Sequence, residues 1–150
     1  MLDLYIREGS SVVAKELGDQ CKRFSGATVL LTGALGFLGR YFLGYFQYIN
    51  ENVLDKPCRV LAYDNLITVD FATKSEKPVI PNIEFNVHDV TRPMVVSEKI
   101  DYIIHAAGIA SPFYYQKFPL ETLDVAVTGT RNLLELAGNK GTKGVLFFSS

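Results

Sequence analysis

The sequence predicts an α/β fold with a doubly wound parallel sheet, and three observations along the chain indicate it. An apolar run at residues 28–31 leads into a glycine-rich stretch at 32–39, Thr-Gly-Ala-Leu-Gly-Phe-Leu-Gly, and a helical pattern begins near Phe37. A second apolar run, at 59–63, ends in the acidic residue Asp64. Short apolar runs that alternate with helical patterns are typical of parallel strands joined by crossover helices. We therefore predict a Rossmann-type sheet over residues 26–150.

The three glycines of the stretch at 32–39 have separate expected roles. Gly33 lets the chain turn sharply off the strand, and Gly36 lets the backbone approach a pyrophosphate with no Cβ in the way. Gly39 lies on the first helical turn, where it permits close packing of helix and strand. The free N–H groups and the positive end of the helix dipole then meet the anion. The alternative is a chance glycine turn, which the flanking strand and helix disfavour.

Length and composition narrow the class of protein. The 150 residues suffice for one domain with a real core, and the net charge of −1 gives no reason to expect nucleic acid or an anionic membrane as a partner. No apolar stretch approaches the ~20 residues that span a bilayer. The N-terminus lacks the basic start and apolar core of a signal peptide. The pattern of Cys21, Cys58, His88 and His105 predicts neither a disulfide framework nor a metal site, so we expect reduced thiols in a cytoplasmic protein.

Residues 1–25 form an expected helical extension before the first strand. Ser10 or Ser11 is placed to cap a helix whose apolar residues recur at roughly helical spacing through Leu17 and Cys21. This helix either packs on the domain, which is the interpretation we favour, or contacts a partner subunit.

The helix and strand after the glycine stretch lead to the first candidate ligand-binding side chain. The helix places Leu38, Phe42, Tyr45 and Ile49 on one face, which we expect to be core. The strand at 59–63 ends at Asp64-Asn65. A carboxylate there can accept hydrogen bonds from both hydroxyls of an adenine ribose, and it would repel a 2′-phosphate, which favours NAD over NADP. The alternative is a simple Asp-Asn turn.

Two further strands are expected, at 83–87 and 102–107, after a surface loop at 67–81. Asp89 follows the first of these, before a short helix near Arg92 that it could cap. The second is a continuous apolar run that ends in Ala106-Ala107-Gly108, which suits a central strand whose carboxyl end faces a ligand. We expect His105 to be a packed strand residue and not a catalytic base.

A long helix is expected at 120–137, followed by a last strand at 145–148. The helix has apolar residues on one side, namely Leu120, Leu123, Val127, Leu134 and Ala137. Residues 138–144 end it with two glycines. The last strand runs into Ser149-Ser150.

These motifs resemble the extended short-chain dehydrogenase/reductases that modify nucleotide sugars. The resemblance covers residues 26–150 and is carried by Gly-x-x-Gly-x-x-Gly with Phe-Leu inside it, by Asp-Asn-Leu at 64–66, by Ala-Ala-Gly at 106–108, and by Gly-Thr-x-Asn-Leu at 129–133. It implies that Asp89 binds the exocyclic amine of adenine, with Val90 against the ring. The implied NAD-binding residues are Gly33, Gly36, Phe37, Leu38, Gly39, Asp64, Asn65, Asp89, Val90, Ala106, Ala107 and Gly108.

Within this family the UDP-glucuronate decarboxylase branch is the most similar, on the loop expected at 111–115 (Ser-Pro-Phe-Tyr-Tyr), which would lie next to the sugar. The resemblance implies that NAD⁺ takes a hydride from C4 of the sugar while a tyrosinate takes the hydroxyl proton. It also implies a homodimer of the intact enzyme, formed through the helix at 120–137 and the next helix, which we expect to lie outside this chain. Ala126 is a departure, because the family usually has an Asn there that helps to position the cofactor.

No catalytic residue is assigned in this chain. The family uses a hydroxyl residue after Ser149-Ser150 and a Tyr-x-x-x-Lys pair, and here no Tyr is followed four residues later by Lys. We therefore expect the cofactor-binding half of such an enzyme, with the sheet incomplete at its C-terminal side, the substrate domain absent and no activity of its own. The alternatives are a sensor or scaffold that holds NAD(P) without turnover, and a Rossmann domain for another adenine ligand such as S-adenosylmethionine, which a glycine loop suited to a pyrophosphate disfavours.

Overall fold

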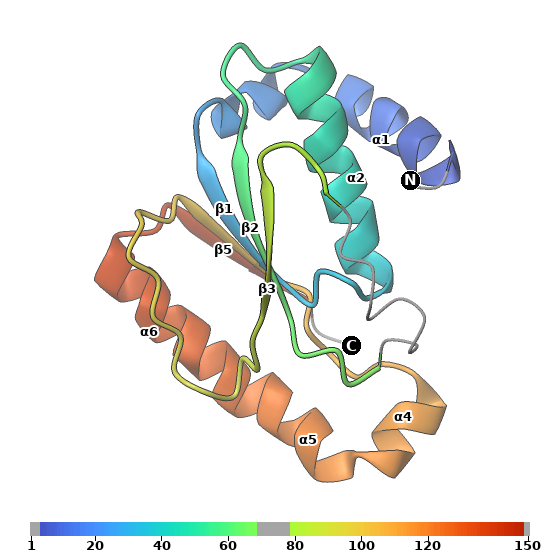
Figure 1. Ribbon diagram of the computed structural model, residues 1–150, viewed down its shortest axis with the longest axis vertical. Coiled ribbons are helices and arrows are strands. Elements are labelled where there is room, and N and C mark those ends of the chain that lie inside the picture. Colours follow the sequence, from blue (N-terminus) through green and yellow to red (C-terminus); the bar gives the residue numbers. More distant parts are fainter. Residues whose placement is uncertain (1–3, 69–78, 149–150) are drawn as a thin grey trace.

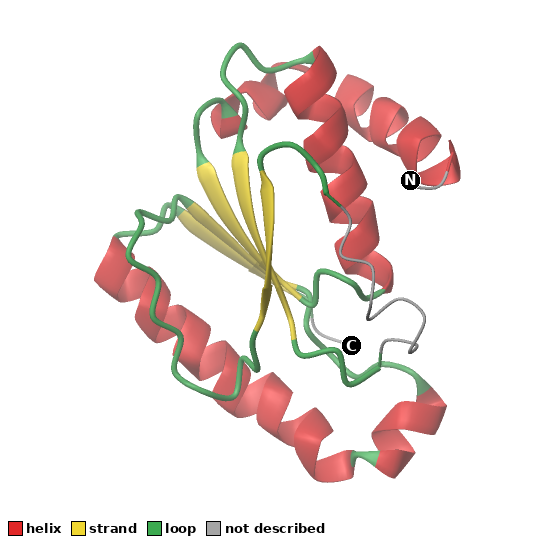
Figure 2. Ribbon diagram, viewed as in Figure 1, coloured by secondary structure: helices red, strands yellow, loops and turns green. Residues whose placement is uncertain are grey.

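The centre of the computed structural model, which describes residues 4–68 and 79–148, is a parallel sheet of five strands (Figures 1 and 2). The strands are β1 (Thr28–Thr32), β2 (Arg59–Asp64), β3 (Ile83–Val87), β4 (Tyr102–His105) and β5 (Gly144–Phe147). They lie in the order β3-β2-β1-β4-β5. Because this order reverses at β1, the chain leaves β1 and β4 toward opposite sides and opens a crevice at their carboxyl ends. The predicted doubly wound α/β fold is confirmed.

Helices cover both faces of the sheet (Figure 1). On one face α2 (Phe37–Asn52) packs between the sheet and α1 (Leu4–Leu17), which continues as the 3₁₀ helix η1 (Gly18–Phe24). On the other face the helical segment 119–140 is made of α5 (Pro119–Asp124), the π-helical turn η2 (Val125–Gly129) and α6 (Thr130–Lys140). None of the helices in the described ranges is long and apolar enough to cross a membrane.

Two apolar clusters hold these layers together, one on each face of the sheet. Neighbouring strand residues point to opposite faces, so Leu31 joins the cluster under α2 whereas Leu30 joins the cluster under α6. Under α2 the buried side chains include Val29, Leu43, Phe46, Ile49 and Val60. Under α6 they include Leu61, Ile100, Ile103, Leu133 and Leu136.

The N-terminal helix packs on the domain, but it does not begin at Ser10 or Ser11 as predicted. It is already helical at Leu4, and Ser10 lies inside it with its hydroxyl 2.6 Å from the Ile6 carbonyl oxygen, to which it donates. Ile6 lies against Gly44 of α2 so closely that a Cβ there would collide with it. A serine hydroxyl that bonds back to the preceding turn is compatible with a helix interior, which the sequence pattern did not reveal. Contact with a partner subunit stays a prediction.

The buried face of α2 is rotated relative to the predicted one. Tyr45 and Ile49 are buried, but Leu38 is 38% exposed and Phe42 is only partly buried. The face centres on residues at positions i, i+4 and i+7, namely Gly39, Leu43 and Phe46. Gly39 sets this rotation, because it is the residue at which the helix touches the turn after β1.

Two predictions for the connecting segments were wrong. Residues 112–117 form the short helix α4 (Pro112–Lys117) where a loop was predicted; Pro112 at its first turn has the φ that a helix needs. The chain near Arg92 makes a turn and not a helix. The prediction for 67–81 falls largely on residues 69–78, which lie outside the described residues. Gly141, with φ of +61°, ends α6 as expected, and the Thr142 amide donates to the Ala137 carbonyl.

Candidate functional site

Most of the predicted cofactor-binding residues meet in one cavity at the carboxyl ends of β1, β2 and β4. The cavity has a volume of about 50 Å³. Its walls also include Tyr63, Ile67, Thr68, His88, Ile109 and Val125. Eight of the twelve predicted residues line it, namely Gly33, Gly36, Asp64, Asn65, Val90, Ala106, Ala107 and Gly108. Residues from four separate parts of the chain therefore converge where the strand order reverses.

The glycine loop is built from positions that exclude a side chain. Gly33 has a φ of +70°, and a Cβ on it would lie 2.5 Å from the Ala106 carbonyl oxygen. A Cβ on Gly39 would collide with the Gly33 carbonyl and the backbone of Ala34. On Gly36 a Cβ would meet only the Gly33 carbonyl oxygen, at 3.2 Å. Gly33 and Gly39 are thus required by the packing of the loop itself, whereas Gly36 leaves its outer side open to a ligand.

The N-terminus of α2 presents unpaired donors. The Gly36 amide donates to the Gly33 carbonyl and the Arg40 amide to the Gly36 carbonyl. The amides of Phe37, Leu38 and Gly39, which lie between these two residues, have no acceptor within residues 4–68 and 79–148. This is expected for the first turn of a helix. Three N–H groups and the positive helix end form an arrangement that fits a diphosphate.

The Asp64 carboxylate joins the end of β2 to the glycine loop. One of its oxygens accepts the Leu35 amide at 2.9 Å and the other accepts the Leu66 amide at 2.8 Å. Next to it, the Asn65 side chain accepts the Ile67 amide at 3.1 Å. Because a carboxylate has about four acceptor positions, two remain for ribose hydroxyls. The turn and the ribose role, which were alternatives in the sequence, are compatible here.

The loop after β3 is held in place by the helical segment on the far face. The Val90 carbonyl accepts the side-chain amide of Asn132 at 2.8 Å, and a Cβ on Gly129 would lie 2.8 Å from a Val90 methyl group. Asp89 does not cap a helix, because its carboxylate accepts the amide and the hydroxyl of Thr91 in a tight turn. The spacing Gly-Thr-x-Asn was visible in the sequence, but its role in positioning Val90 was not.

His105 is buried, as expected, and it links two strands. Its Nδ1 lies 2.8 Å from the hydroxyl of Thr32, so the last residues of β1 and β4 are joined side by side. Burial lowers the pKa of His105, and the backbone carbonyl of Val125 opposes this weakly. The ring is 1% exposed, which keeps it from acting on a substrate.

The other predicted residues lie around the cavity and not in its wall. Gly39 is buried beneath the loop, and the Asp89 carboxylate is engaged by Thr91. Phe37 is 77% exposed and borders a second cleft of about 510 Å³, which also contains Arg40. Leu38 faces a third hollow, which is apolar. Among the described residues no group of three or more His, Cys, Asp or Glu side chains could hold a metal ion.

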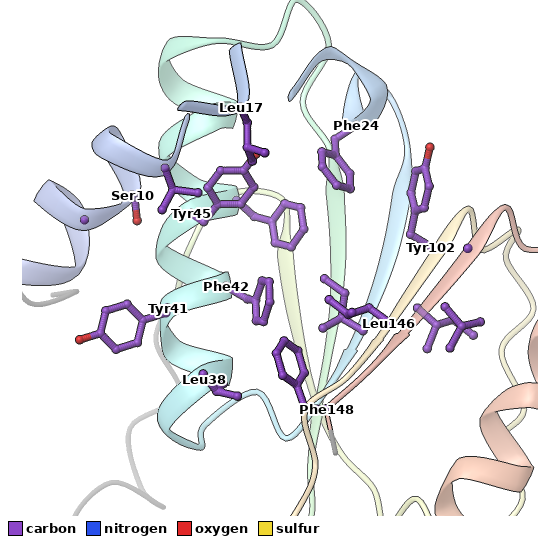
Figure 3. Close-up of a pocket in the computed structure, with 17 residues that line it drawn as sticks. Ser10, Leu17, Phe24, Leu38, Tyr41, Phe42, Tyr45, Tyr102, Leu146 and Phe148 are labelled. Atoms are coloured by element: carbon purple, nitrogen blue, oxygen red, sulfur yellow. The ribbon is translucent and has the colours of Figure 1, made fainter. Parts of the chain in front are cut away.

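An apolar groove lies between α2 and the strands β4 and β5 (Figure 3). Its volume is about 570 Å³, and the rings of Phe42 and Phe148 face each other across it at 5.7 Å. Leu146, on β5, lies on the same side of the groove as Phe148 (Figure 3). The described residues of this lining offer no charged partner for the phosphates of a dinucleotide, so the groove does not fit a cofactor.

Comparison with known proteins agrees with this geometry. Residues 29–150 match the NAD dependent epimerase/dehydratase family, which is more than half of the chain. The chain belongs to this family. Among curated relatives, UDP-glucuronic acid decarboxylase 6 of Arabidopsis thaliana is 32% identical over 126 residues, which are 84% of this chain and 34% of that protein. UDP-glucuronic acid decarboxylase 1 of Danio rerio is 30% identical over 81% of this chain and 27% of that protein.

Solved structures show the same architecture. The epimerase Mth375 of Methanothermobacter thermautotrophicus superposes with a TM-score of 0.70 at 25% identity, over 91% of this chain and 39% of that one. The UDP-glucose 4-epimerase of Bifidobacterium longum, solved with NAD⁺ and UDP, has a TM-score of 0.58 at 22% identity, over 83% of this chain and 37% of that one, which shows the fold alone. The cofactor of the family is NAD. The chain spans about a quarter to a third of the length of the curated relatives it matches.

Proposed function

We propose that this chain is the NAD-binding part of an enzyme that oxidises C4 of a nucleotide sugar, of the UDP-glucuronate decarboxylase type. The observation that carries the proposal is the Asp64 carboxylate, held between the glycine loop and the end of β2 with acceptor positions to spare. The curated relatives named above, which are UDP-glucuronic acid decarboxylases, support this choice of substrate and reaction.

The residues of the chain have distinct proposed tasks toward NAD. Asp64 accepts the ribose hydroxyls, and the amides at the start of α2 bind the diphosphate. Val90 packs against the adenine ring, which Asn132 makes possible by fixing its backbone. The small residues at 106–108 leave room for the nicotinamide ribose. When bound, NAD supplies the acceptor for a hydride from the sugar.

We further propose that the catalytic groups lie outside this chain, which then binds the cofactor without turning over substrate. No Tyr is followed four residues later by Lys in the 150 residues. His105, the titratable side chain at the end of β4, is buried and engaged by Thr32. A Tyr-x-x-x-Lys pair in a longer form of the protein would support the enzyme, and its absence there would favour a non-catalytic NAD(P) sensor or scaffold.

A homodimer is the proposed assembly of the intact enzyme. The helical segment 119–140 carries an outward apolar stripe, whose members are Leu120, Leu123, Val127 and Leu134, each more than half exposed. Apolar side chains aligned on one helix face are typical of a surface that another helix covers.

The proposed localisation is the cytoplasm. Cys21 and Cys58 are buried free thiols, which suits the reducing conditions there.

The ribose assignment is tested by Asp64→Asn and Asp64→Ala, with NAD and NADP titrated separately. We expect Asp64→Ala to weaken NAD binding by roughly tenfold or more, since hydrogen bonds to a charged group are lost. Asp64→Asn keeps the shape and one acceptor but removes the charge, so it should narrow the preference for NAD over NADP. Asp55→Asn, an exposed carboxylate after α2, is the matched control. Unchanged NAD affinity in Asp64→Ala would overturn the assignment.

A further inference from the structure

Arg40 is the charged side chain of the cleft that adjoins the glycine loop. It lies in the first turn of α2, is exposed, and borders the cleft of about 510 Å³ together with Gly36 and Phe37. The opposite wall is the chain from Gly108 to Ser111, with Tyr114. Among the described residues of this lining none is acidic. These residues therefore bring one full positive charge to the cleft, to which the helix dipole adds.

One nitrogen of the Arg40 guanidinium donates a hydrogen bond within the chain, and the other two remain available to a ligand. Its Nε donates to the Leu35 carbonyl oxygen at 3.0 Å. In the described part of the chain no carboxylate forms an ion pair with it. A guanidinium has five N–H donors, so four remain, arranged in a planar fork that matches phosphate oxygens.

Asp64 and Arg40 are both anchored on the same residue of the glycine loop. The Asp64 carboxylate accepts the Leu35 amide, and Arg40 donates to the Leu35 carbonyl. The negative carboxylate of Asp64 and the positive guanidinium of Arg40 therefore lie on either side of the glycine loop. A ligand that fits both has hydroxyl donors at one end and a diphosphate next to them, which describes an adenosine diphosphate ester.

We propose that Arg40 is the counter-ion of the cofactor diphosphate and that it supplements the backbone amides of α2. This rests on the proposed NAD-binding function and adds to it a side chain that sets affinity. The amides and the dipole contribute only partial charge, about half an elementary charge, against the two negative charges of the diphosphate. Arg40 supplies a full charge at the point where the phosphates must lie.

The test compares three ligands, adenosine, ADP-ribose and NAD, on the wild-type chain and on Arg40→Ala, by NMR titration of the backbone amides. We expect Arg40→Ala to lower the affinity for ADP-ribose and for NAD by roughly tenfold, because charge-assisted hydrogen bonds are lost. Adenosine has no phosphate, so its affinity should not change. Arg40→Lys keeps the charge without the fork and should be intermediate. Arg23→Ala, an exposed arginine in η1 at the amino end of the sheet, is the matched control.

The outcomes separate this inference from the proposed function. Equal NAD affinity in wild type and Arg40→Ala overturns the role of Arg40 alone, as does an equal loss for adenosine, which would indicate a structural disturbance. Absence of NAD binding by the wild-type chain overturns the proposed function, and the inference with it. Salt gives an independent check: between about 0.01 M and 1 M, where the Debye length falls from about 30 Å to 3 Å, the difference between wild type and Arg40→Ala should disappear.

Discussion

The two sides of the crevice differ in how far their groups are already paired. On the β1–β2–β3 side, the side chains of Asp64, Asn65 and Asp89 all accept backbone amides, and Val90 is held by Asn132. On the β4–β5 side, the chain from Gly108 onward is largely exposed, and the residues at 145–148 in and after β5 are 39–46% exposed. The polar side chains of the proposed adenosine side are thus already held by the backbone, whereas the β4–β5 side keeps exposed apolar surface.

The largest expected effect compares an alanine substitution at one glycine on each side of the crevice. Gly33→Ala places a Cβ against the Ala106 backbone at a φ of +70°, and we expect it to cost about 3 kcal/mol of unfolding free energy and to abolish NAD binding. Gly108→Ala has no atom within 4 Å and no positive φ, so it should be nearly neutral. Chemical denaturation of both variants measures the contrast. Similar losses at the two positions would contradict it.

The second-largest expected effect is on stability and concerns Asp101. This residue connects β1 with the segments before β4 and β5 at the amino end of the sheet. Its carboxylate accepts the Thr28 amide and pairs with Lys99 and Lys143, and the Thr28 hydrogen bond above all lowers its pKa to about 2. A carboxyl group with a lowered pKa stabilises the fold above its usual pKa, near 4, and this stabilisation is lost as the pH falls through about 2. We expect Asp101→Asn to cost about 2 kcal/mol at neutral pH.

The matching measurement is the free energy of unfolding as a function of pH. The wild-type chain should lose stability between pH 4 and 2 more steeply than Asp101→Asn, and the two curves should converge at the acid end. Parallel curves over that interval would show that Asp101 does not carry the effect.

A smaller effect is expected at Asn132, which holds the adenosine side from the far face. Asn132→Ala removes the hydrogen bond to the Val90 carbonyl, and we expect a loss of about 1 kcal/mol with a severalfold loss of NAD affinity. Asn139→Ala, exposed on the same helix, is the control. Thermal unfolding with and without NAD separates the two contributions. Unchanged NAD affinity would place Asn132 outside the adenine site.

The smallest effect on folding is expected on the outward face of the segment 119–140. Leu123→Lys changes a side chain that is 60% exposed, so the unfolding midpoint should shift little. If the stripe is a dimer surface, the same change should convert a dimer to a monomer in sedimentation experiments. A longer form of the protein that is monomeric at every concentration tested would contradict the proposed dimer.

The sequence pattern predicted elements better than it predicted which face of a helix is buried. All five strands and the helix after the glycine loop were found close to their predicted ranges, because an apolar run or a helical period is a local signal. The buried faces of two helices were not readable in this way. In α2 the contact at Gly39 sets the rotation, and in the segment 119–140 the apolar side is mostly exposed, with Val125, Gly129 and Leu133 facing inward.

The sequence by itself determined the fold class, the glycine loop and the acid at the end of β2, since each depends on a few residues close together in the chain. Only the tertiary structure decided that Asp64 and Arg40 meet at Leu35, that Asn132 positions Val90, and that Thr32 joins His105. These pairs come from separate elements, and their contacts depend on the register of parallel strands and the rotation of helices. Those quantities are set by packing over the whole domain and leave no local pattern.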